Sequence, residues 1–499
     1  MRTASAATHA GTGINGLDNI LIGGFPRNRI YLVEGDPGTG KTTLGMQFLF
    51  EGREQGERGL YVTLSETLDE LNSVADSHGW TMKGIEVLEL IAAQDLATAE
   101  DQYTVFDPAE VELGETLRSI LAEVERIQPA RVVLDSLSEL RLLAQGSLRY
   151  RRQILALKQF FAGRKCTVLL LDDMSAGTAD QHVQSLAHGV VRLQQLPAEF
   201  GVDRRILRIQ KVRGVAFRSG SHDFHIATGG LQVYPRLVAA EHPGHPFDEF
   251  LSSGVEKVDA LLEGGIRRAT STLFLGPVGS GKSTLAAQYA HAAATRGEKV
   301  AIYLFEEGLQ TYIERCQGLN IDVCSPHLSE FITVQQIDPA ELSPGHYADI
   351  VRQAVELDGV RLVVIDSLNG YFNAMPGERQ LLLQLHELLS FLRQHGVTTL
   401  LTEGQHGMMG TDMSSPVDVS YLADTVFLLR YFEAGGEVRK AMSIIKNRTG
   451  GHERTIREFK MGAGGYVVGE PLREFQGVLT GIPNYVGKAA PLLGKNVDD

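Results

Sequence analysis

Short apolar runs alternate along this chain with longer stretches of helical periodicity. In the first half, residues 30–35, 59–64, 131–136 and 166–172 are apolar and rich in β-branched side chains, and residues 42–56 and 154–164 have helical patterns. Residues 272–276, 300–305, 361–367 and 398–403 repeat the strand pattern in the second half. Nearly continuous apolar strands separated by helices are typical of parallel sheets covered on both faces. The pattern therefore predicts an α/β protein with mainly parallel sheets.

The two halves of the chain are copies of one unit. Lys41 lies in GDPGTGKTTL and Lys282 in GPVGSGKSTL, 241 positions later, and the same offset relates Asp18 to Asp259 and Glu66 to Glu307. The repeat is far longer than a solenoid unit, which indicates a domain duplication. We expect a first domain over residues 1–240, a second over 241–470, and a C-terminal appendage and tail over 471–499.

Each half contains a glycine-rich phosphate-binding loop between a strand and a helix. In such P-loops the backbone amides surround the phosphates, the helix N-terminus attracts their negative charge, and the lysine reaches the β- and γ-phosphates. The residues expected to bind ATP or ADP here are Gly38, Thr39, Gly40, Lys41, Thr42 and Thr43 in the first domain, and Gly279, Ser280, Gly281, Lys282, Ser283 and Thr284 in the second.

Carboxylates follow two further strands of each half. Asp135 ends RVVLD and Asp366 ends RLVVID, and we expect them to anchor Mg²⁺ together with the hydroxyls of Thr42 and Ser283.

An acidic pair follows a neighbouring strand in the second half. Glu306 and Glu307 come after AIYLF, where they could act as general bases, and the first half has Ser65 and Glu66 instead. Glu66, Glu306 and Glu307 are therefore the candidate catalytic residues.

Pairs of cations follow a late strand in each half. Lys211 and Arg213 lie in ILRIQKVRG, and Lys446 and Arg448 lie in MSIIKNRTG. Such a pair could reach a γ-phosphate as an arginine finger does, usually in the site of a neighbouring subunit.

Charge and composition limit the choice of partners. The 499 residues have a formal net charge of −14, which argues against nucleic acid as the main partner. No apolar run is long enough for a membrane span, and the N-terminus lacks the pattern of a secretory signal. We expect a cytoplasmic protein that binds neither membranes nor specific nucleic acid.

These motifs, in this order, resemble the KaiC circadian-clock ATPase family, a branch of the RecA-like P-loop proteins. SETLDELNSVADSHGW, IKNRTGGHERTIREF and FQGVLTGIPN add to the resemblance, which extends from about Gly13 to Val486. It implies two tandem RecA-like domains in a two-tier homohexamer, with ATP and Mg²⁺ between subunits. It also implies slow ATP hydrolysis in the first tier and Ser/Thr autokinase activity in the second.

The resemblance also implies a modification site and protein partners. Ser420 and Tyr421 stand where the family has an adjacent Ser-Thr phosphorylation pair, so we expect Ser420 to be phosphorylated and Tyr421 not to be its equal. A KaiB-like partner is implied for the first tier. The tail after Val486 does not resemble the family's KaiA-binding segment, so the resemblance does not extend to a KaiA-like activator.

Two other readings use the same core. A RecA/RadA-like DNA-dependent ATPase would need a basic DNA path, of which the sequence shows no sign. A nucleotide-gated signalling scaffold would use ATP only to hold a ring together, and the pair Glu306 and Glu307 favours catalysis over that reading.

Overall fold

The computed structural model describes residues 8–90, 108–144, 146–174, 181–197, 201–238, 248–373, 378–405, 419–462, 465–479 and 484–486. Its contacts divide the chain into two units, Met1–Arg236 and Leu237–Asp499. Among the described residues, no helix has both the length and the apolar character that crossing a membrane requires.

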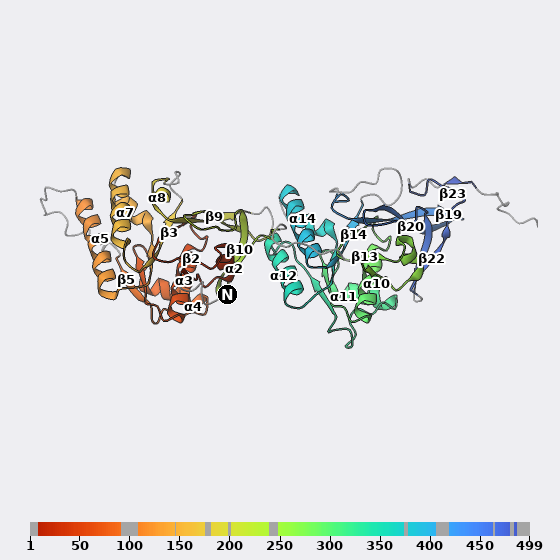
Figure 1. Cartoon of the computed structure of the whole chain (residues 1–499), viewed down its shortest axis with the longest axis horizontal. Coiled ribbons are helices and arrows are strands. Elements are labelled where there is room, and N and C mark those ends of the chain that lie inside the picture. The colour runs from red at the N-terminus through yellow and green to blue at the C-terminus, as the bar shows by residue number, and fades with distance from the viewer. Residues whose placement is uncertain are drawn as a thin grey trace, which may run out of the picture. The chain divides into compact units, whose positions relative to one another are not determined.

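The first unit is built on a nine-stranded sheet in the order β11-β10-β9-β8-β3-β7-β6-β4-β5 (Figure 1). The strands from β8 to β5 in this order are parallel, and β9, β10 and β11 extend the sheet as antiparallel strands. The strands are β3 (Ile30–Gly35), β4 (Gly59–Thr63), β5 (Glu86–Glu89), β6 (Arg131–Asp135), β7 (Thr167–Asp173), β8 (Gly189–Leu196), β9 (Arg204–Val212), β10 (Ser221–Ala227) and β11 (Gly230–Tyr234).

Helices cover both faces of this sheet. One hydrophobic cluster joins a face of the sheet to α3 and α4, and another joins the opposite face to α5, α6 and α7. The helices are α2 (Asn15–Ile20), α3 (Lys41–Glu54), α4 (Leu68–Ser77), α5 (Pro108–Ile127), α6 (Leu137–Ala144), α7 (Ser147–Phe161) and α8 (Gln181–Leu186); the short strands β1 (His9–Ala10) and β2 (Phe25–Pro26) form a separate ribbon.

The second unit repeats this plan with strands in the order β16-β15-β17-β18-β14-β19-β20-β21-β22. Its parallel part runs from β16 to β19, followed by antiparallel β20, β21 and β22. The strands are β14 (Ser271–Gly276), β15 (Val300–Leu304), β16 (Ile332–Gln336), β17 (Leu362–Asp366), β18 (Thr398–Gly404), β19 (Thr425–Ala434), β20 (Glu437–Asn447), β21 (Arg457–Gly462) and β22 (Gly465–Pro471).

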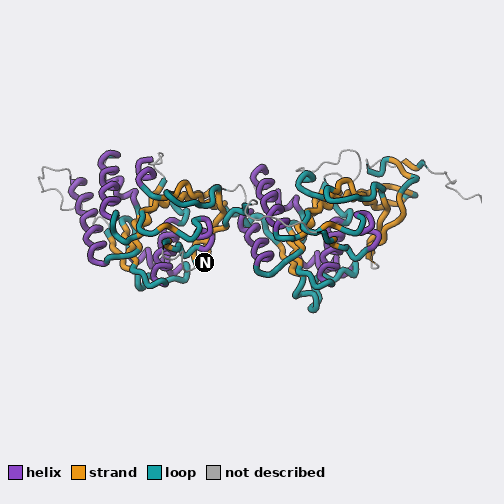
Figure 2. Tube along the Cα trace, in the orientation of Figure 1, coloured by secondary structure: helices purple, strands orange, loops and turns teal. Residues whose placement is uncertain are grey.

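Its helices again lie on both faces of the sheet. In Figure 2, purple helices lie on either side of the orange strands in each unit. They are α9 (Glu256–Asp259), the 3₁₀ turn η3 (Ala260–Leu262), α10 (Lys282–Thr295), α11 (Leu309–Gly318), α12 (Pro344–Glu356), α13 (Leu368–Asn373) and α14 (Glu378–Gln394). Two short ribbons complete the unit: β12 (Phe250–Leu251) with β13 (Ile266–Arg267), and β23 (Phe475–Gln476) with β24 (Asn484–Tyr485).

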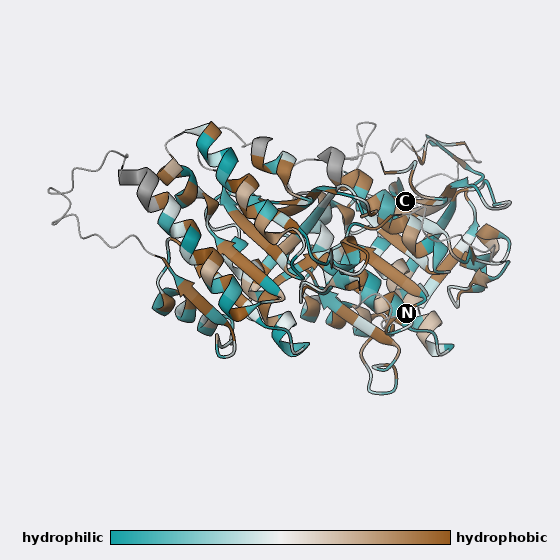
Figure 3. Ribbon diagram, turned by 60° about the vertical axis from the view of Figure 1, so that its left-hand side comes forward, coloured by the Kyte–Doolittle hydropathy of each residue, from teal (hydrophilic) through white to brown (hydrophobic). Residues whose placement is uncertain are grey.

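The central strands are buried along their whole length and mainly apolar, as the predicted parallel sheets require. The strands β3, β4, β6, β14, β15 and β17 are buried at every position. Figure 3 shows largely brown strands between helices of mixed colour. A strand buried on both faces cannot alternate polar and apolar residues without placing polar groups in the core. The predicted α/β class with two RecA-like domains is confirmed.

Candidate nucleotide-binding sites

The two P-loops follow the central strands β3 and β14. Gly40 and Gly281 immediately precede α3 and α10 with φ angles of 93° and 108°, a left-handed conformation that favours glycine. A Cβ atom on Gly40 would also lie 2.7 Å from Cδ1 of Ile226. These glycines let the loop close over the helix N-terminus, which leaves its first amides available for phosphate oxygens.

Both P-loop lysines are buried and turn back into their own loops. Lys41 Nζ donates to the carbonyl oxygens of Gly35 and Asp36, at 3.0 and 2.9 Å. Lys282 Nζ donates to the corresponding carbonyls of its own loop at 2.9 and 2.8 Å. Burial lowers the pKa of Lys282 to about 8. An anion placed in this loop would therefore restore favourable interactions to a cation that has lost most of its hydration.

The predicted magnesium ligands of each domain are in direct contact. Thr42 Oγ1 donates to Asp135 Oδ2, and Ser283 Oγ donates to Asp366 Oδ1, both at 2.9 Å. Burial raises the pKa of both carboxyls, because water no longer solvates the charged forms. A hydroxyl and a desolvated carboxylate beside a phosphate loop suit Mg²⁺, which would be held there with the phosphates of the nucleotide.

Sequence reasoning missed the groups that orient these carboxylates. Tyr61 donates its hydroxyl to Asp135 Oδ2 at 2.6 Å, and Thr402 donates to Asp366 Oδ1 at 2.5 Å. Both come from strands that neighbour the carboxylate strand in the sheet. Pairing between distant strands brings them there, and no motif marks them in the sequence.

The candidate general bases differ between the domains. Glu66 is half-buried, its Oε2 has no hydrogen-bond partner, and burial, followed by the charge of Asp135, raises its pKa. Glu307, at the equivalent place, forms a bidentate ion pair with Arg315 on α11, at 2.7 and 3.1 Å. The position of Arg315 is occupied by Val74 in the first domain.

Arg315 was also missed from the sequence, and it changes the expected roles in the second domain. Its Nη1 donates to Thr284 Oγ1 at 3.0 Å, so one guanidinium joins Glu307 to the P-loop helix. The arginine thus occupies both carboxylate oxygens of Glu307. Glu306 is exposed, which leaves it as the better candidate base.

The predicted finger lysines lie level with the middle of the strand that carries each P-loop. Lys211 pairs through Val190 with Leu32, three residues before the end of β3, and Lys446 lies level with Leu273 of β14 in the same way. At about 3.3 Å per residue, each lysine starts about 10 Å from the end of the strand that carries the P-loop. Phosphate loop and finger cations of one domain therefore do not meet.

Three of these cations bind backbone carbonyls outside the P-loop of their own domain. Lys211 Nζ donates to the carbonyl of Gln184 on α8, and Arg213 Nη2 donates to that of Ser185 at 2.6 Å. Lys446 Nζ donates to the carbonyl of Ser420 at 2.6 Å. The structure thus brings the predicted phosphorylation site Ser420 next to a finger cation, although 26 residues separate them in the sequence.

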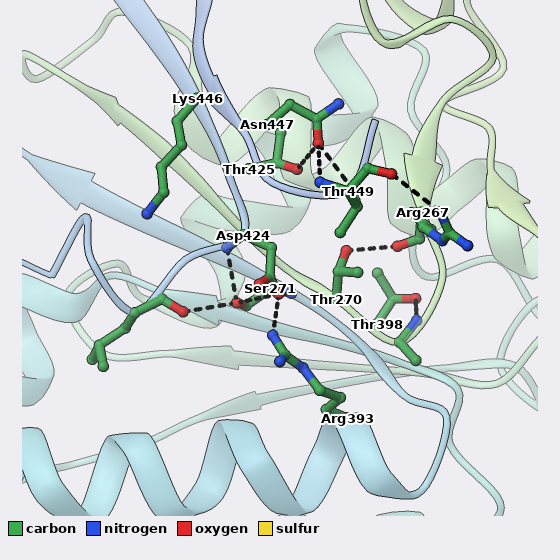
Figure 4. A network of polar contacts seen from close by, with 12 residues as sticks. Arg267, Thr270, Ser271, Arg393, Thr398, Asp424, Thr425, Lys446, Asn447 and Thr449 are labelled. Carbon is green, nitrogen blue, oxygen red and sulfur yellow. Dashed lines mark hydrogen bonds and ion pairs between the residues drawn. The ribbon is translucent and has the colours of Figure 1, made fainter. Parts of the chain in front are cut away.

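A polar network fixes the segment that carries Ser420 and Tyr421 (Figure 4). Buried Asp424 accepts hydrogen bonds from Ser271 N and Oγ at 3.0 and 3.2 Å and pairs with Arg393 of α14. Its carbonyl accepts from the backbone N–H of Arg448 at 2.9 Å. Tyr421 has 52% of its surface exposed.

The fold and these sites define a tandem P-loop ATPase with one nucleotide-binding core in each half. The family model described as "ATPase: KaiC" matches residues 10–238 and 251–473, so the chain belongs to the KaiC family of ATPases. Similar proteins include the circadian clock protein KaiC3 of Synechocystis, 25% identical over 96% of this chain and 95% of its own length. The circadian clock oscillator protein KaiC of Synechococcus elongatus is 26% identical over 95% and 92%.

Proposed function

We propose that this protein is a ring-forming ATPase that binds one MgATP in each domain and phosphorylates itself on Ser420. The two P-loops with their paired hydroxyls and carboxylates support binding of ATP, ADP and Mg²⁺. The names of the clock proteins that it resembles support a role in circadian or related timing signalling.

The observation that carries this proposal is the separation of phosphate loop and finger cations in both domains. Lys41 and Lys282 lie at the carboxyl edge of their sheets, and Lys211 and Lys446 lie about 10 Å back along the strands. A site that needs both kinds of cation is completed by a neighbouring copy. Closed rotational symmetry satisfies every such contact, and we propose a homohexamer with ATP at each subunit boundary.

The position of Ser420 beside Lys446 supports self-phosphorylation. Because Ser420 lies beside Lys446, a finger cation that reaches the neighbour's γ-phosphate would bring the Ser420 hydroxyl with it. We assign Glu306 of the domain that holds the ATP as general base. Ser420 Oγ forms a bond to the γ-phosphorus as its proton moves to Glu306, and the bond to the β-phosphate oxygen breaks to release ADP.

Tyr421 is a poor substitute for a second phosphorylated residue. In-line transfer requires the reacting atoms about 3–3.5 Å apart. A tyrosine hydroxyl lies a whole ring further from the backbone than a serine hydroxyl, so a backbone that presents Ser420 correctly carries the Tyr421 oxygen past the phosphate. Its exposed ring instead suits packing at the subunit boundary.

Three measurements test the proposal. Nucleotide content should fall from two per chain to one in Lys41→Ala and in Lys282→Ala, and native mass spectrometry should show hexamers only with nucleotide. Phosphopeptide mapping after hours with MgATP should place phosphate on Ser420. Two nucleotides per chain in both lysine variants would refute the site assignment, and phosphate mainly on Tyr421 would refute the kinase mechanism.

The protein partners follow from the family resemblance and need their own test. We propose a KaiB-like protein as the ligand of the first domain, no KaiA-like activator, and no specific nucleic acid. ATP hydrolysis measured with and without duplex DNA should be unchanged, and stimulation by DNA would favour a recombinase-like motor instead.

A further inference from the structure

The P-loop lysine of the first domain has a partner that its counterpart lacks. Lys41 Nζ forms an ion pair with Asp173 Oδ1 at 2.6 Å, in addition to its two hydrogen bonds to loop carbonyls. Asp173 ends β7 and lies level with Gly35 in the sheet. In the second domain Gly404 lies level with Gly276, and Lys282 makes no ion pair with any residue that the structure describes.

The carboxylate of Asp173 is held in this position. Ser138 on α6 donates its hydroxyl to Asp173 Oδ2 at 3.4 Å and accepts from the Asp173 backbone N–H at 3.3 Å. The equivalent residue of the second domain, Asn369, binds only the backbone of Gly404, at 2.7 and 2.9 Å. A polar residue on α6 or α13, each of which precedes the strand it contacts, thus fixes the end of that strand in both domains, and only the first domain has a negative charge at this position.

We propose that Asp173 determines the nucleotide affinity of the first domain by competing with the phosphates for Lys41. The inference rests on the proposed nucleotide site and deepens it. A phosphate reaches Lys41 Nζ only after the ion pair opens, and the displaced carboxylate stays within the same site. The first domain therefore binds nucleotide more weakly than it would with glycine at this position.

The surrounding charges strengthen this effect. Asp173 shares the first site with Asp135 and Glu66, and its charge contributes to the raised pKa of each. Lys282 of the second domain also lies near three carboxylates, Asp366, Glu306 and Glu403, but no described residue forms an ion pair with it, and Arg315 balances the charge of Glu307 there. Repulsion between unit charges about 6–12 Å apart, at an effective dielectric constant of about 20, corresponds to a change on the order of ten- to a hundred-fold in affinity. Mg²⁺ reduces this repulsion, so weakening is larger for ADP without the metal.

The experiment uses the full chain carrying Lys282→Ala, which leaves the first site as the nucleotide site. The dissociation constants for MgADP, and for ADP in EDTA, are measured by titration calorimetry for this parent and for the added changes Asp173→Asn and Asp173→Gly. Both Asp173 variants should bind MgADP at least about ten-fold more tightly than the parent, and their affinity for ADP in EDTA should increase by a larger factor. Asp76→Asn, on an exposed position of α4, removes the same charge away from Lys41 and should change affinity by less than about two-fold.

A reciprocal variant tests the same idea in the second domain. A Cβ on Gly404 would make only ordinary contacts with Asn369, at 3.5 Å or more, so Gly404→Asp fits the fold. In a chain carrying Lys41→Ala it should weaken MgADP binding about ten-fold.

The outcomes separate this inference from the proposed function. If the parent binds MgADP and Asp173→Asn binds it equally or more weakly, with an unchanged melting curve, the competition is refuted and the nucleotide site stands. If neither the parent nor the Asp173 variants bind nucleotide, both are refuted. Binding that appears only in the Asp173 variants supports the competition in its strongest form.

Discussion

Mixed rings offer the sharpest test of a shared active site in the second domain. One chain carries Lys282→Ala and so lacks the P-loop cation, and the other carries Lys446→Ala and so lacks the finger cation. If each site lay within one chain, every site in a mixture would stay defective. If the site lies between copies, an intact P-loop from a Lys446→Ala chain can lie beside an intact finger cation from a Lys282→Ala chain. Such a boundary has a complete active site.

The expected magnitude follows from this geometry. In a ring assembled at random from equal amounts, the P-loop is intact with a chance of one half, and so is the neighbour's finger. About a quarter of the boundaries should therefore be complete in a cyclic ring. Loss of a finger cation costs about 10³–10⁵ in rate, so each parent contributes almost nothing. The mixture should regain about 25% of the wild-type Ser420 phosphorylation.

The assay is phosphopeptide mass spectrometry after subunit exchange without nucleotide and reassembly with MgATP. The chain with both changes, mixed with wild type, is the control, because it contributes no complementary half-site. Phosphorylation in the mixture of single variants that does not exceed the sum of the two parents would refute the shared site, provided that native mass spectrometry shows mixed rings.

Three further predictions concern single residues. Glu306→Gln should lower the rate of Ser420 phosphorylation by about 100-fold or more. Glu307→Gln should lower it by less than about ten-fold, because Arg315 already binds the Glu307 carboxylate, and an equal loss in both variants would contradict these roles. Burial raises the pKa of Asp18 from 3.8 to about 6. The ionised carboxylate therefore destabilises the folded state fully above about pH 6, and this destabilisation has largely disappeared near pH 4. Asp18→Asn should therefore raise the unfolding free energy by up to about 3 kcal/mol at pH 7 and by little at pH 4, and a gain independent of pH in denaturant titrations would contradict that. Arg131→Leu removes the donor that this fully buried arginine supplies to the carbonyls of Gly11 and Phe48, at 2.6 and 2.7 Å. It should lower the melting transition of the first domain by about 10 °C in calorimetry, and no shift would show that these contacts are dispensable.

The sequence alone determined the repeated α/β plan and the position of each phosphate loop. Buried parallel strands need unbroken apolar runs, and the loops need glycine, lysine and a hydroxyl residue at fixed spacing, so local composition contains both signals. The pairing of Thr42 with Asp135 was also within reach, because both come at the carboxyl ends of strands in one sheet. These features depend on short segments whose chemistry is independent of the rest of the chain.

Only the tertiary structure decided how the two sites differ. Arg315 reaches Glu307 because α11 carries it back over the end of its strand, and Asp173 reaches Lys41 because β7 lies beside β3. Strand order and register also place Lys446 about 10 Å back along the strands from the end that carries its own P-loop. Contacts of this kind join residues far apart in the sequence, and no local pattern specifies which strands become neighbours. The duplicated P-loops share their glycines and their lysine, and the ion pairs around them make the two sites unequal.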